Sequence, residues 1–432
     1  MKRSAFFAVA LFVLTVRVGS AARAGTDPVL SEIAAAAPGA TVRVSAGVHH
    51  VHLLLTRPIT VEGAPGAILD GDGTGDVVRI ASPGVVVRDL IIRNSGRHLT
   101  PMNAGVFIEG KATGALVERN QIVDSLFGVY INGTSRVKVL NNVVQGITTL
   151  RVADRGDGIH LWNDRDCVIQ GNDVGPARDG IYFYISPNNL IAGNRIHDVR
   201  YGMHDMYSNH VAIVGNRSYR NVAGYALMSS DHLDIKDNVA ADDYSYGFLL
   251  NYVTYSRFDG NRIDGIVDTV DLDSGIGSGM EGKGIYIYNS EFNRFERNEI
   301  ADSTIGVHVT AGSEHNEVFG NAFVGNRTQV KYDELTALEW SRNGHGNYWS
   351  NYLGWDMNGD GIGDVPYRPN SGVDVLLWKY PSARLLMSSP ATLLLRYVQR
   401  AFPVFTPPGI TDHFPLMRAP RGLTSDGNGK LD

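Results

Sequence analysis

The chain has 432 residues, with 39 lysine and arginine residues against 45 aspartate and glutamate residues, which gives a formal net charge of −6 at pH 7. This acidic balance argues against nucleic acid as a partner. The sequence contains one cysteine, so an internal disulfide is excluded, and no apolar run reaches the roughly 20 residues of a membrane span.

Residues 1–24 have the pattern of a Sec-type signal peptide. Lys2 and Arg3 precede a mostly apolar stretch at residues 5–16, and small residues at 22 and 24 fit cleavage near Ala24. Four basic residues leave with this segment, so the mature chain carries 35 basic and 45 acidic residues, a net charge of about −10. We therefore expect an exported, soluble protein.

Residues 25–104 are expected to form an N-terminal cap and the first coils of the repeat that follows. Residues 30–36 suit a short amphipathic helix, and residues 42–44, 59–61 and 85–87 suit strands. A cap is needed because the first unit of a repeat structure has no preceding neighbour to cover its core.

Residues 105–330 repeat one pattern, a glycine followed by alternating apolar and polar residues and then an asparagine. Successive glycines are 22 or 23 residues apart, except for steps of 30 and 37 residues before Gly158 and Gly284. A period of about 22 residues leaves no room for a helix between strands, so the sequence predicts an all-β right-handed parallel β-helix. The repeated residues are Gly105, Gly128, Gly158, Gly180, Gly202, Gly224, Gly247, Gly284 and Gly306, and Asn120, Asn142, Asn172, Asn194, Asn216, Asn238, Asn261, Asn298 and Asn321.

The repeat also predicts where the backbone turns. Glycine and asparagine are expected at the corners of the coils, because both tolerate left-handed backbone angles. The two long steps are insertions, and we expect residues 143–157 and 262–283 to loop out on the side of the strand that follows each glycine. Cys167 takes an apolar position of its coil and is expected to be a buried core thiol.

The residues two and four positions after each glycine share the outer face of one strand per coil, because the residues between them are apolar and face the core. We call this face the outer ribbon. A solvated strand face normally carries small polar or charged side chains, whereas this one is rich in aromatic, histidine and methionine residues, which indicates a binding surface. Its members are Phe107, Glu109, Tyr130, Asn132, His160, Trp162, Tyr182, Tyr184, His204, Met206, Ala226, Met228, Leu249, Asn251, Tyr286, Tyr288, His308 and Thr310.

One part of the outer ribbon combines an imidazole with thioethers. His204 and Met206 share a strand, Met228 follows Met206 one coil later, and His160 lies two coils earlier. Imidazole and thioether ligands suit Cu(I) better than magnesium or calcium. These four residues are therefore candidate Cu(I) ligands. An open alternative is a hydrophobic protein-binding strip in which methionine is adaptable filler.

Three further residues belong to this candidate site. Met102 and Met280 lie in segments that lead into the same set of strands and are weaker candidates at its rim. Asp205 places a carboxylate where every other coil has an apolar, inward side chain. A buried charge must be paired or neutral, so we expect either a local bulge or a hydrogen-bonded carboxyl group that supports the ligands from beneath.

Residues 331–432 form a C-terminal extension with a different composition. Apolar residues recur at helical spacing over residues 376–386 and 391–402, which fits either a cap on the last coil or a docking segment for a partner.

The extension also contains a candidate calcium loop. Asp356, Asn358, Asp360 and Asp364 occupy positions 1, 3, 5 and 9 of such a loop, with glycine at position 6. Position 12 is Tyr367, where a bidentate glutamate is expected. The segment is therefore either a structural calcium site or a tight glycine turn.

Two motifs resemble the NosD family of periplasmic nitrous oxide reductase maturation proteins: Gly-Asn-Tyr-Trp-Ser-Asn-Tyr-Leu-Gly-Trp-Asp at 346–356 and Gly-Asp-Gly-Ile-Gly-Asp-Val-Pro-Tyr at 359–367. The resemblance extends to residues 281–284 and 376–408. It implies a β-helix that receives copper from a lipoprotein chaperone, associates with a membrane ABC transporter and helps to deliver copper to apo nitrous oxide reductase. It implies no enzymatic activity, and it favours docking for the C-terminal segment.

The competing interpretation is a carbohydrate-binding or polysaccharide-cleaving β-helix. Five outer-ribbon residues have aromatic faces that can stack on sugars: Trp162, Tyr182, Tyr184, Tyr286 and Tyr288. Asp157 is the candidate catalytic group for that activity, but the neighbouring second carboxylate that acid and base roles require is not evident.

Overall fold

The computed structural model describes residues 27–267, 281–310, 312–332, 336–380 and 408–420, together with the single positions 334, 382, 390, 394 and 397. The predicted signal peptide and Met280 lie outside the described residues, as do most of the predicted helical positions between 381 and 402. No helix that the structure describes is both long and apolar enough to cross a bilayer.

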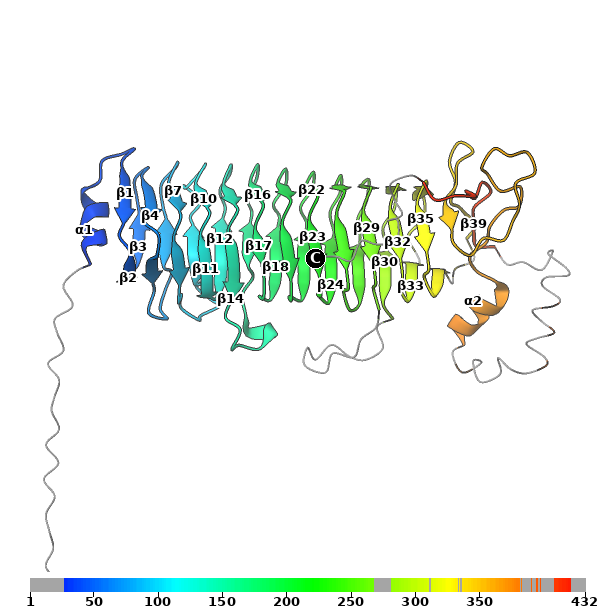
Figure 1. Ribbon diagram of the computed structural model, residues 1–432, viewed down its shortest axis with the longest axis horizontal. Coiled ribbons are helices and arrows are strands. Elements are labelled where there is room, and N and C mark those ends of the chain that lie inside the picture. The colour runs from blue at the N-terminus through cyan, green and yellow to red at the C-terminus, as the bar shows by residue number, and fades with distance from the viewer. Residues whose placement is uncertain are drawn as a thin grey trace, which may run out of the picture.

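Three long parallel sheets form a solenoid, because each coil adds one strand to each sheet in turn (Figure 1). The predicted right-handed parallel β-helix is confirmed. The first sheet, sheet A, contains β1 (Thr41–Val44), β4 (Thr60–Gly63), β7 (Val86–Arg88), β10 (Leu116–Glu118), β13 (Lys138–Leu140), β16 (Val168–Gln170), β19 (Leu190–Ala192), β22 (Ala212–Val214), β25 (Asp234–Lys236), β28 (Arg257–Asp259), β31 (Arg294–Glu296) and β34 (Glu317–Phe319).

Sheets B and C run beside sheet A along the same axis. Sheet B contains β2 (Gly47–His50), β5 (Ala67–Asp70), β8 (Ile91–Arg93), β11 (Gln121–Ser125), β14 (Val143–Gly146), β17 (Asp173–Val174), β20 (Arg195–His197), β23 (Arg217–Tyr219), β26 (Val239–Ala241), β29 (Arg262–Asp264), β32 (Glu299–Ala301), β35 (Ala322–Val324) and β38 (Tyr348–Trp349). Sheet C, whose outer face is the outer ribbon, contains β3 (Leu53–Leu55), β6 (Val78–Ile80), β9 (Ala104–Ile108), β12 (Phe127–Asn132), β15 (Ile159–Trp162), β18 (Asp179–Tyr184), β21 (Tyr201–Met206), β24 (Ala223–Met228), β27 (Tyr246–Asn251), β30 (Lys283–Tyr288), β33 (Ile305–Val309) and β36 (Thr328–Tyr332).

The core is one continuous column of inward apolar side chains. Met203 and Cys167 are both part of it, as their positions in the repeat predict, and burial raises the pKa of the Cys167 thiol to about 12. Each coil buries these residues against the next coil, so the hydrophobic stabilisation comes from stacking along the axis.

The repeated glycines are required by the close approach of successive coils. A Cβ atom at Gly180 would lie 2.2 Å from Cγ2 of Ile196 and 2.6 Å from the carbonyl oxygen of Gly202. Left-handed angles occur instead at the residue before each repeated asparagine, such as Asn141 and Gly193, with φ of 54° and 59°. The expectation of left-handed angles at the repeated glycines and asparagines is therefore wrong.

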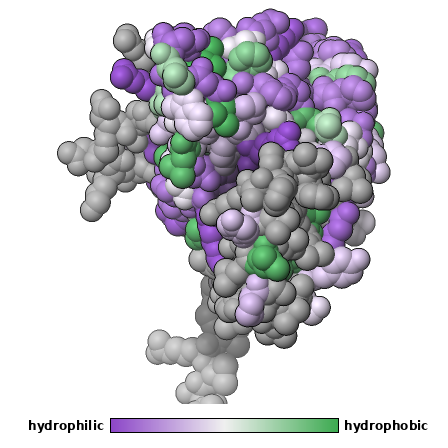
Figure 2. Space-filling model, turned by 90° about the vertical axis from the view of Figure 1, so that its right-hand side faces the viewer, coloured by the Kyte–Doolittle hydropathy of each residue, from purple (hydrophilic) through white to green (hydrophobic). Residues whose placement is uncertain are grey.

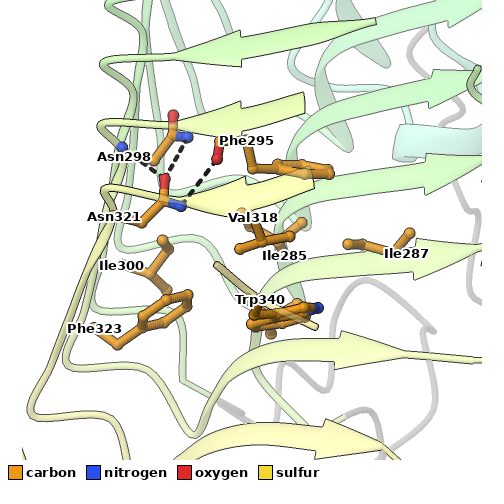
Figure 3. Close-up of a pocket in the computed structure, with 10 residues that line it drawn as sticks. Ile285, Ile287, Phe295, Asn298, Ile300, Val318, Asn321, Phe323 and Trp340 are labelled. Carbon is orange, nitrogen blue, oxygen red and sulfur yellow. Dashed lines mark hydrogen bonds between the residues drawn. The ribbon is translucent and has the colours of Figure 1, made fainter. Parts of the chain in front are cut away.

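The repeated asparagines turn their side chains into the solenoid and form a ladder. Nδ2 of Asn298 donates to Oδ1 of Asn321 (2.9 Å), and Nδ2 of Asn321 donates to the carbonyl oxygen of Phe295 (3.0 Å), as Figure 3 shows. The small cavity in the same view is lined by apolar side chains and these two amides, so it offers no titratable group. The asparagine ladder comprises Asn120, Asn142, Asn172, Asn194, Asn216, Asn238, Asn261, Asn298, Asn321 and Asn347.

The two ends of the solenoid are closed differently (Figure 1). Helix α1 (Pro28–Ala35) covers the first coil with Val29 and Ile33. The predicted cap helix is present and begins two residues earlier than expected. At the other end β37 (Leu338–Glu339) pairs with β39 (Ile410–Thr411), and the buried Asp412 accepts hydrogen bonds from the backbone N–H of Asn347 (2.7 Å) and Nε1 of Trp349 (2.8 Å). The C-terminal extension thus caps the core. It also contains α2 (Gly372–Lys379).

The two insertions are shorter than predicted, because each predicted loop begins with a strand, β14 or β29. The first insertion contains the short 3₁₀ helix Val152–Asp154 and lies beside sheet C, as predicted. Its Ile147 and Leu150 pack with Phe107, Phe127 and Tyr130 on one end of the outer ribbon. Residues 268–280 of the second insertion lie outside the described residues. Seen along the axis from the C-terminal side, the described surface is mainly hydrophilic, with scattered hydrophobic residues (Figure 2).

Candidate metal centre

The candidate ligands lie on β21 and β24, two neighbouring strands of sheet C. Met206 and Met228 are direct partners in the register of these strands, so their side chains stand next to each other on the outer face. His204 precedes Met206 by two residues and shares that face, as the alternation predicts. The structure therefore places His204, Met206 and Met228 on the same face of two neighbouring strands. Both methionines are half-buried, and His204 is 8% exposed.

A fully buried carboxylate fixes the orientation of His204. Its Nδ1 lies 2.9 Å from Oδ2 of Asp179, a carboxylate that also accepts hydrogen bonds from Nη2 and Nε of Arg200 at 2.6 and 2.8 Å. Burial alone would raise the pKa of Asp179, but the hydrogen bonds from His204 and Arg200 outweigh it and lower the pKa. Nδ1 is thus occupied as a donor, which leaves Nε2 as the nitrogen that is available to bind a metal ion. Histidines that bind metals typically have such a carboxylate partner.

Tyr182 contacts both His204 and Met206. Its ring lies 4.6 Å from that of His204, and its hydroxyl donates to Sδ of Met206 at 3.5 Å. Burial raises the pKa of Tyr182 to about 12, so the hydroxyl remains a donor at neutral pH. Tyr182 therefore holds Met206 in place through a weak hydrogen bond to sulfur.

His160 also has a buried carboxylate partner, but it lies at a separate place on the outer ribbon. Its Nδ1 lies 2.7 Å from Oδ2 of the buried Asp157, whose Oδ1 accepts from Nε of Arg178 at 3.1 Å. Tyr182 lies between the two imidazoles, 4.8 Å from the ring of His160. The structure therefore does not place His160 beside the other three candidate ligands. Among the described residues, its buried Nε2 has no hydrogen-bond partner.

Asp205 points into the core, as the sequence indicates. Its strand has no bulge at this position, so the first of the two expected explanations for an inward carboxylate is wrong. Asp205 pairs in regular register with Phe183 and Leu227 and is fully buried. Burial raises its pKa well above the usual value, so the carboxyl group is neutral. Ser208 and Ser230 lie beside it, but their hydroxyls donate to backbone carbonyl oxygens. The carboxylate in contact with His204 is Asp179.

The opposite end of the outer ribbon is unfavourable for a cation. His308 stands near Lys331 and Lys283, and burial together with these two positive charges lowers its pKa to about 3. A positive charge near an imidazole disfavours a metal ion there as it disfavours a proton. Of the three outer-ribbon histidines, His160 and His204 therefore have the electrostatic surroundings of metal ligands, whereas His308 does not.

The remaining candidates lie apart from this centre. Met102 packs against the apolar cluster around Tyr130 rather than near Met206. In the predicted calcium loop, Asp356 accepts hydrogen bonds from the backbone N–H groups of Gly359 (2.7 Å) and Gly361 (2.9 Å). Calcium binding by Asp356, Asn358, Asp360 and Asp364 stays a prediction.

Sequence reasoning missed the two carboxylates that support the histidines. Asp157 and Asp179 each precede a repeated glycine, at a position where the other coils have alanine, phenylalanine, tyrosine, isoleucine or, once, lysine. A charged residue at a position that is apolar or aromatic in most coils was the available signal. The competing catalytic interpretation of Asp157 must account for its burial, because both of its oxygens already accept hydrogen bonds from His160 and Arg178.

Solved structures with the same architecture define the class of protein. The A-module of the Azotobacter vinelandii mannuronan C-5 epimerase AlgE4 matches with a TM-score of 0.56 and 17% identity, over 71% of this chain and 92% of that chain. At this identity the likeness shows the fold alone. The protein is thus one of the right-handed parallel β-helix proteins, a class that contains enzymes as well as binding proteins.

Sequence comparison narrows the class to one family. Residues 140–354 match the family model described as periplasmic copper-binding protein (NosD). Two proteins named probable ABC transporter binding protein NosD are similar over most of their length. The one from Pseudomonas aeruginosa is 53% identical over 87% of this chain and 88% of its own, and the one from Stutzerimonas stutzeri is 49% identical over 88% and 87%. The chain belongs to the NosD family.

Proposed function

We propose that this protein binds Cu(I) on the outer ribbon and delivers it to the apo form of nitrous oxide reductase, working in the periplasm with a membrane ABC transporter. In this proposal a lipoprotein chaperone supplies the copper, and the protein itself is not an enzyme. The family description supports the metal and the compartment. The names of the two relatives support the transporter as a partner.

The proposed ligands are Nε2 of His204 and the two sulfur atoms of Met206 and Met228. The observation that carries the proposal is the hydrogen bond between Asp179 and His204, because it orients an imidazole on the strand face that also carries two adjacent methionines. Thioethers are soft, neutral ligands that favour Cu(I), and the carboxylate partner strengthens the imidazole as a ligand. The site therefore combines selectivity for Cu(I) with few bonds to break on transfer.

The position of the site on the outside of sheet C suits transfer to another protein. Met206 and Met228 are half-buried rather than enclosed, so a partner can approach the metal from the outer face. Exchange of one ligand at a time between two soft sites requires no redox step. The neighbouring aromatic residues Trp162 and Tyr184, stacked at 4.7 Å, offer a surface against which a partner can pack.

Copper binding is tested by anaerobic titration of the mature protein with Cu(I) against a competing chelator. We expect Met206→Leu and Met228→Leu each to weaken Cu(I) affinity by about tenfold or more, which corresponds to about 1.4 kcal/mol per factor of ten. Leucine keeps the volume but removes the sulfur. His204→Ala should weaken binding further. His308→Ala is the matched control, because His308 has the same place in its coil but lies beside lysines.

Unchanged Cu(I) affinity in the variant that combines His204→Ala with both leucine substitutions would contradict the proposed site. His204 packs against the rings of Tyr182 and Tyr201, at 4.6 and 5.1 Å, so its removal affects packing as well as ligation. Thermal unfolding of each copper-free variant therefore accompanies every titration. A variant counts only if its melting curve shows a folded protein at the temperature of the titration.

Delivery and docking need separate measurements. Cu(I)-loaded protein mixed with apo nitrous oxide reductase should transfer its copper faster than free chelated Cu(I) does. For docking on the transporter we propose the C-terminal extension, in which Tyr380, Leu394 and Tyr397 are more than half exposed. Leu394→Asp with Tyr397→Asp should abolish co-purification with the transporter and leave Cu(I) affinity unchanged. Retained co-purification would move the docking surface elsewhere.

A further inference from the structure

A second cluster of possible ligands lies at the corner between sheets C and A, on the same two coils as Met206 and Met228. His210, Asp231 and His232 each place one ligand atom within 4.8 Å of the others. The imidazole rings of His210 and His232 are 4.9 Å apart between centroids, and Nδ1 of His232 lies 2.5 Å from Oδ1 of Asp231. Neither histidine belongs to the outer ribbon.

The backbone presets this cluster. His210 and His232 occupy equivalent positions of successive coils, both in the left-handed region, with φ of 56° and 54°. The N–H of His210 donates to the carbonyl oxygen of Asp231 at 3.1 Å, and the N–H of Asp231 donates to Oδ1 of Asn209 at 3.1 Å. These bonds hold the backbone of the two corners together, so little backbone ordering is needed to bring the side chains onto one ion.

The charges around the cluster favour a cation. Among the residues that the structure describes, the ion-pair partner of Asp231 is His232 alone. The other three-residue cluster of this kind in the described chain, His50 with Asp70 and Asp72, differs in this respect. There Asp70 already accepts from Nε of Arg93 at 2.7 Å, and a metal ion would have to displace the guanidinium. The cluster around Asp231 is therefore the better cation site.

We propose that His210, Asp231 and His232 form a second metal site, for a divalent ion of the zinc and copper(II) class. Two imidazoles and one carboxylate are the ligand set of such borderline ions, whereas magnesium and calcium prefer oxygen ligands alone and Cu(I) prefers thioethers. The ion would take the place of the hydrogen bond between Nδ1 of His232 and Oδ1 of Asp231. This site does not depend on the Cu(I) proposal, because the two share no ligand.

The test is calorimetric titration of the mature, copper-free protein with zinc sulfate. We expect a site of one zinc ion per chain that weakens more than about tenfold in the variant carrying both His210→Ala and His232→Ala, and also weakens in Asp231→Asn. His315→Ala is the matched control, since His315 is exposed on the same corner and stacks on Phe292 at 4.9 Å. His204→Ala should leave zinc binding unchanged.

A second readout identifies the ligands directly. With one equivalent of Cu(II) in place of zinc, the electron paramagnetic resonance spectrum should show coupling to two imidazole nitrogens in the wild type and lose it in the double alanine variant. All three ligands lie at a surface corner, so circular dichroism should show an unchanged fold. Zinc affinity that is the same in the wild type and the double variant, or that falls with His204→Ala instead, would overturn the proposal.

Discussion

Replacing Asp179 by asparagine tests how the outer ribbon prepares His204. The carboxylate accepts from Nδ1 of His204 at 2.9 Å and from Nη2 of Arg200 at 2.6 Å, with no surface exposed to water. The amide side chain of Asp179→Asn would keep the size and one acceptor oxygen but lose the negative charge. The imidazole would then be a weaker ligand with a less defined orientation. We therefore expect the folded protein to remain and its Cu(I) affinity to fall.

The magnitude follows from the two interactions that change. Loss of a carboxylate that supports a metal-binding histidine typically costs 10–100-fold in affinity, or about 1.4–2.7 kcal/mol. Breaking a buried ion pair costs about 3–5 kcal/mol of folding free energy when the remaining charge is enclosed. About a third of the Arg200 side chain is exposed, so water can solvate it and we expect a loss of about 3 kcal/mol or less.

Asp198→Asn is the matched control for this experiment. Asp198 also accepts from a histidine and an arginine, His197 at 2.6 Å and Arg220 at 2.7 Å, but it follows β20 of sheet B and is partly exposed. Anaerobic Cu(I) competition should therefore give wild-type affinity for Asp198→Asn and weaker binding for Asp179→Asn. Equal affinities in the two folded variants would refute the argument that Asp179 prepares the ligand.

Three further predictions concern stability and reactivity. Asn216→Ala leaves the buried N–H of Asn194 and the carbonyl oxygen of Ile191 without their ladder partners. Urea unfolding should therefore show that the free energy of unfolding falls by about 2–5 kcal/mol. A fall of less than about 1 kcal/mol would contradict the role of the ladder. Burial raises the pKa of Asp164 from 3.8 to about 7, so the folded state holds a proton that the unfolded state releases. Stability should therefore fall between about pH 4 and pH 7 by at most about 4 kcal/mol, and Asp164→Asn should flatten that slope, whereas parallel curves for the two proteins would count against it. The buried Cys167 should react with a maleimide only after denaturant is added, and rapid labelling of the native protein would show that the thiol is accessible.

The fold was predictable because one repeat determines both the coil and its register. The alternation after each glycine predicts Met203 inward and His204 outward, and in the structure Met203 is in the core whereas His204 packs against Tyr182 on the outer face. The same alternation brings Met206 and Met228 together. The prediction of left-handed angles was wrong because it relied on the backbone freedom of Gly180 and its equivalents. In the structure these positions require glycine because there is no room for a side chain.

The hydrogen bonds between buried carboxylates and the histidines of the outer ribbon were not predictable from the same pattern. Asp179 belongs to the coil before His204 and is 25 residues away in the sequence, so their contact depends on where the strand begins at the corner. The pairing of Asp157 with His160 occurs within one coil instead. An alignment of coils predicts which residues share a face, but it does not predict which of two neighbouring carboxylates a side chain selects.

The asparagine ladder has a direction, and this direction makes the number of coils adjustable. Between ladder members each amide donates to the asparagine of the next coil toward the C-terminal end. The first member accepts from the backbone N–H of Leu90, and the last one donates to Asp412, a residue that only accepts when ionised. The terminal requirements are therefore met outside the repeat. Removing one whole unit, residues 217–238, would rejoin Asn216 to Asn261 with the same donor and acceptor and leave both ends unchanged. The length of the binding face is therefore independent of the caps that close the solenoid.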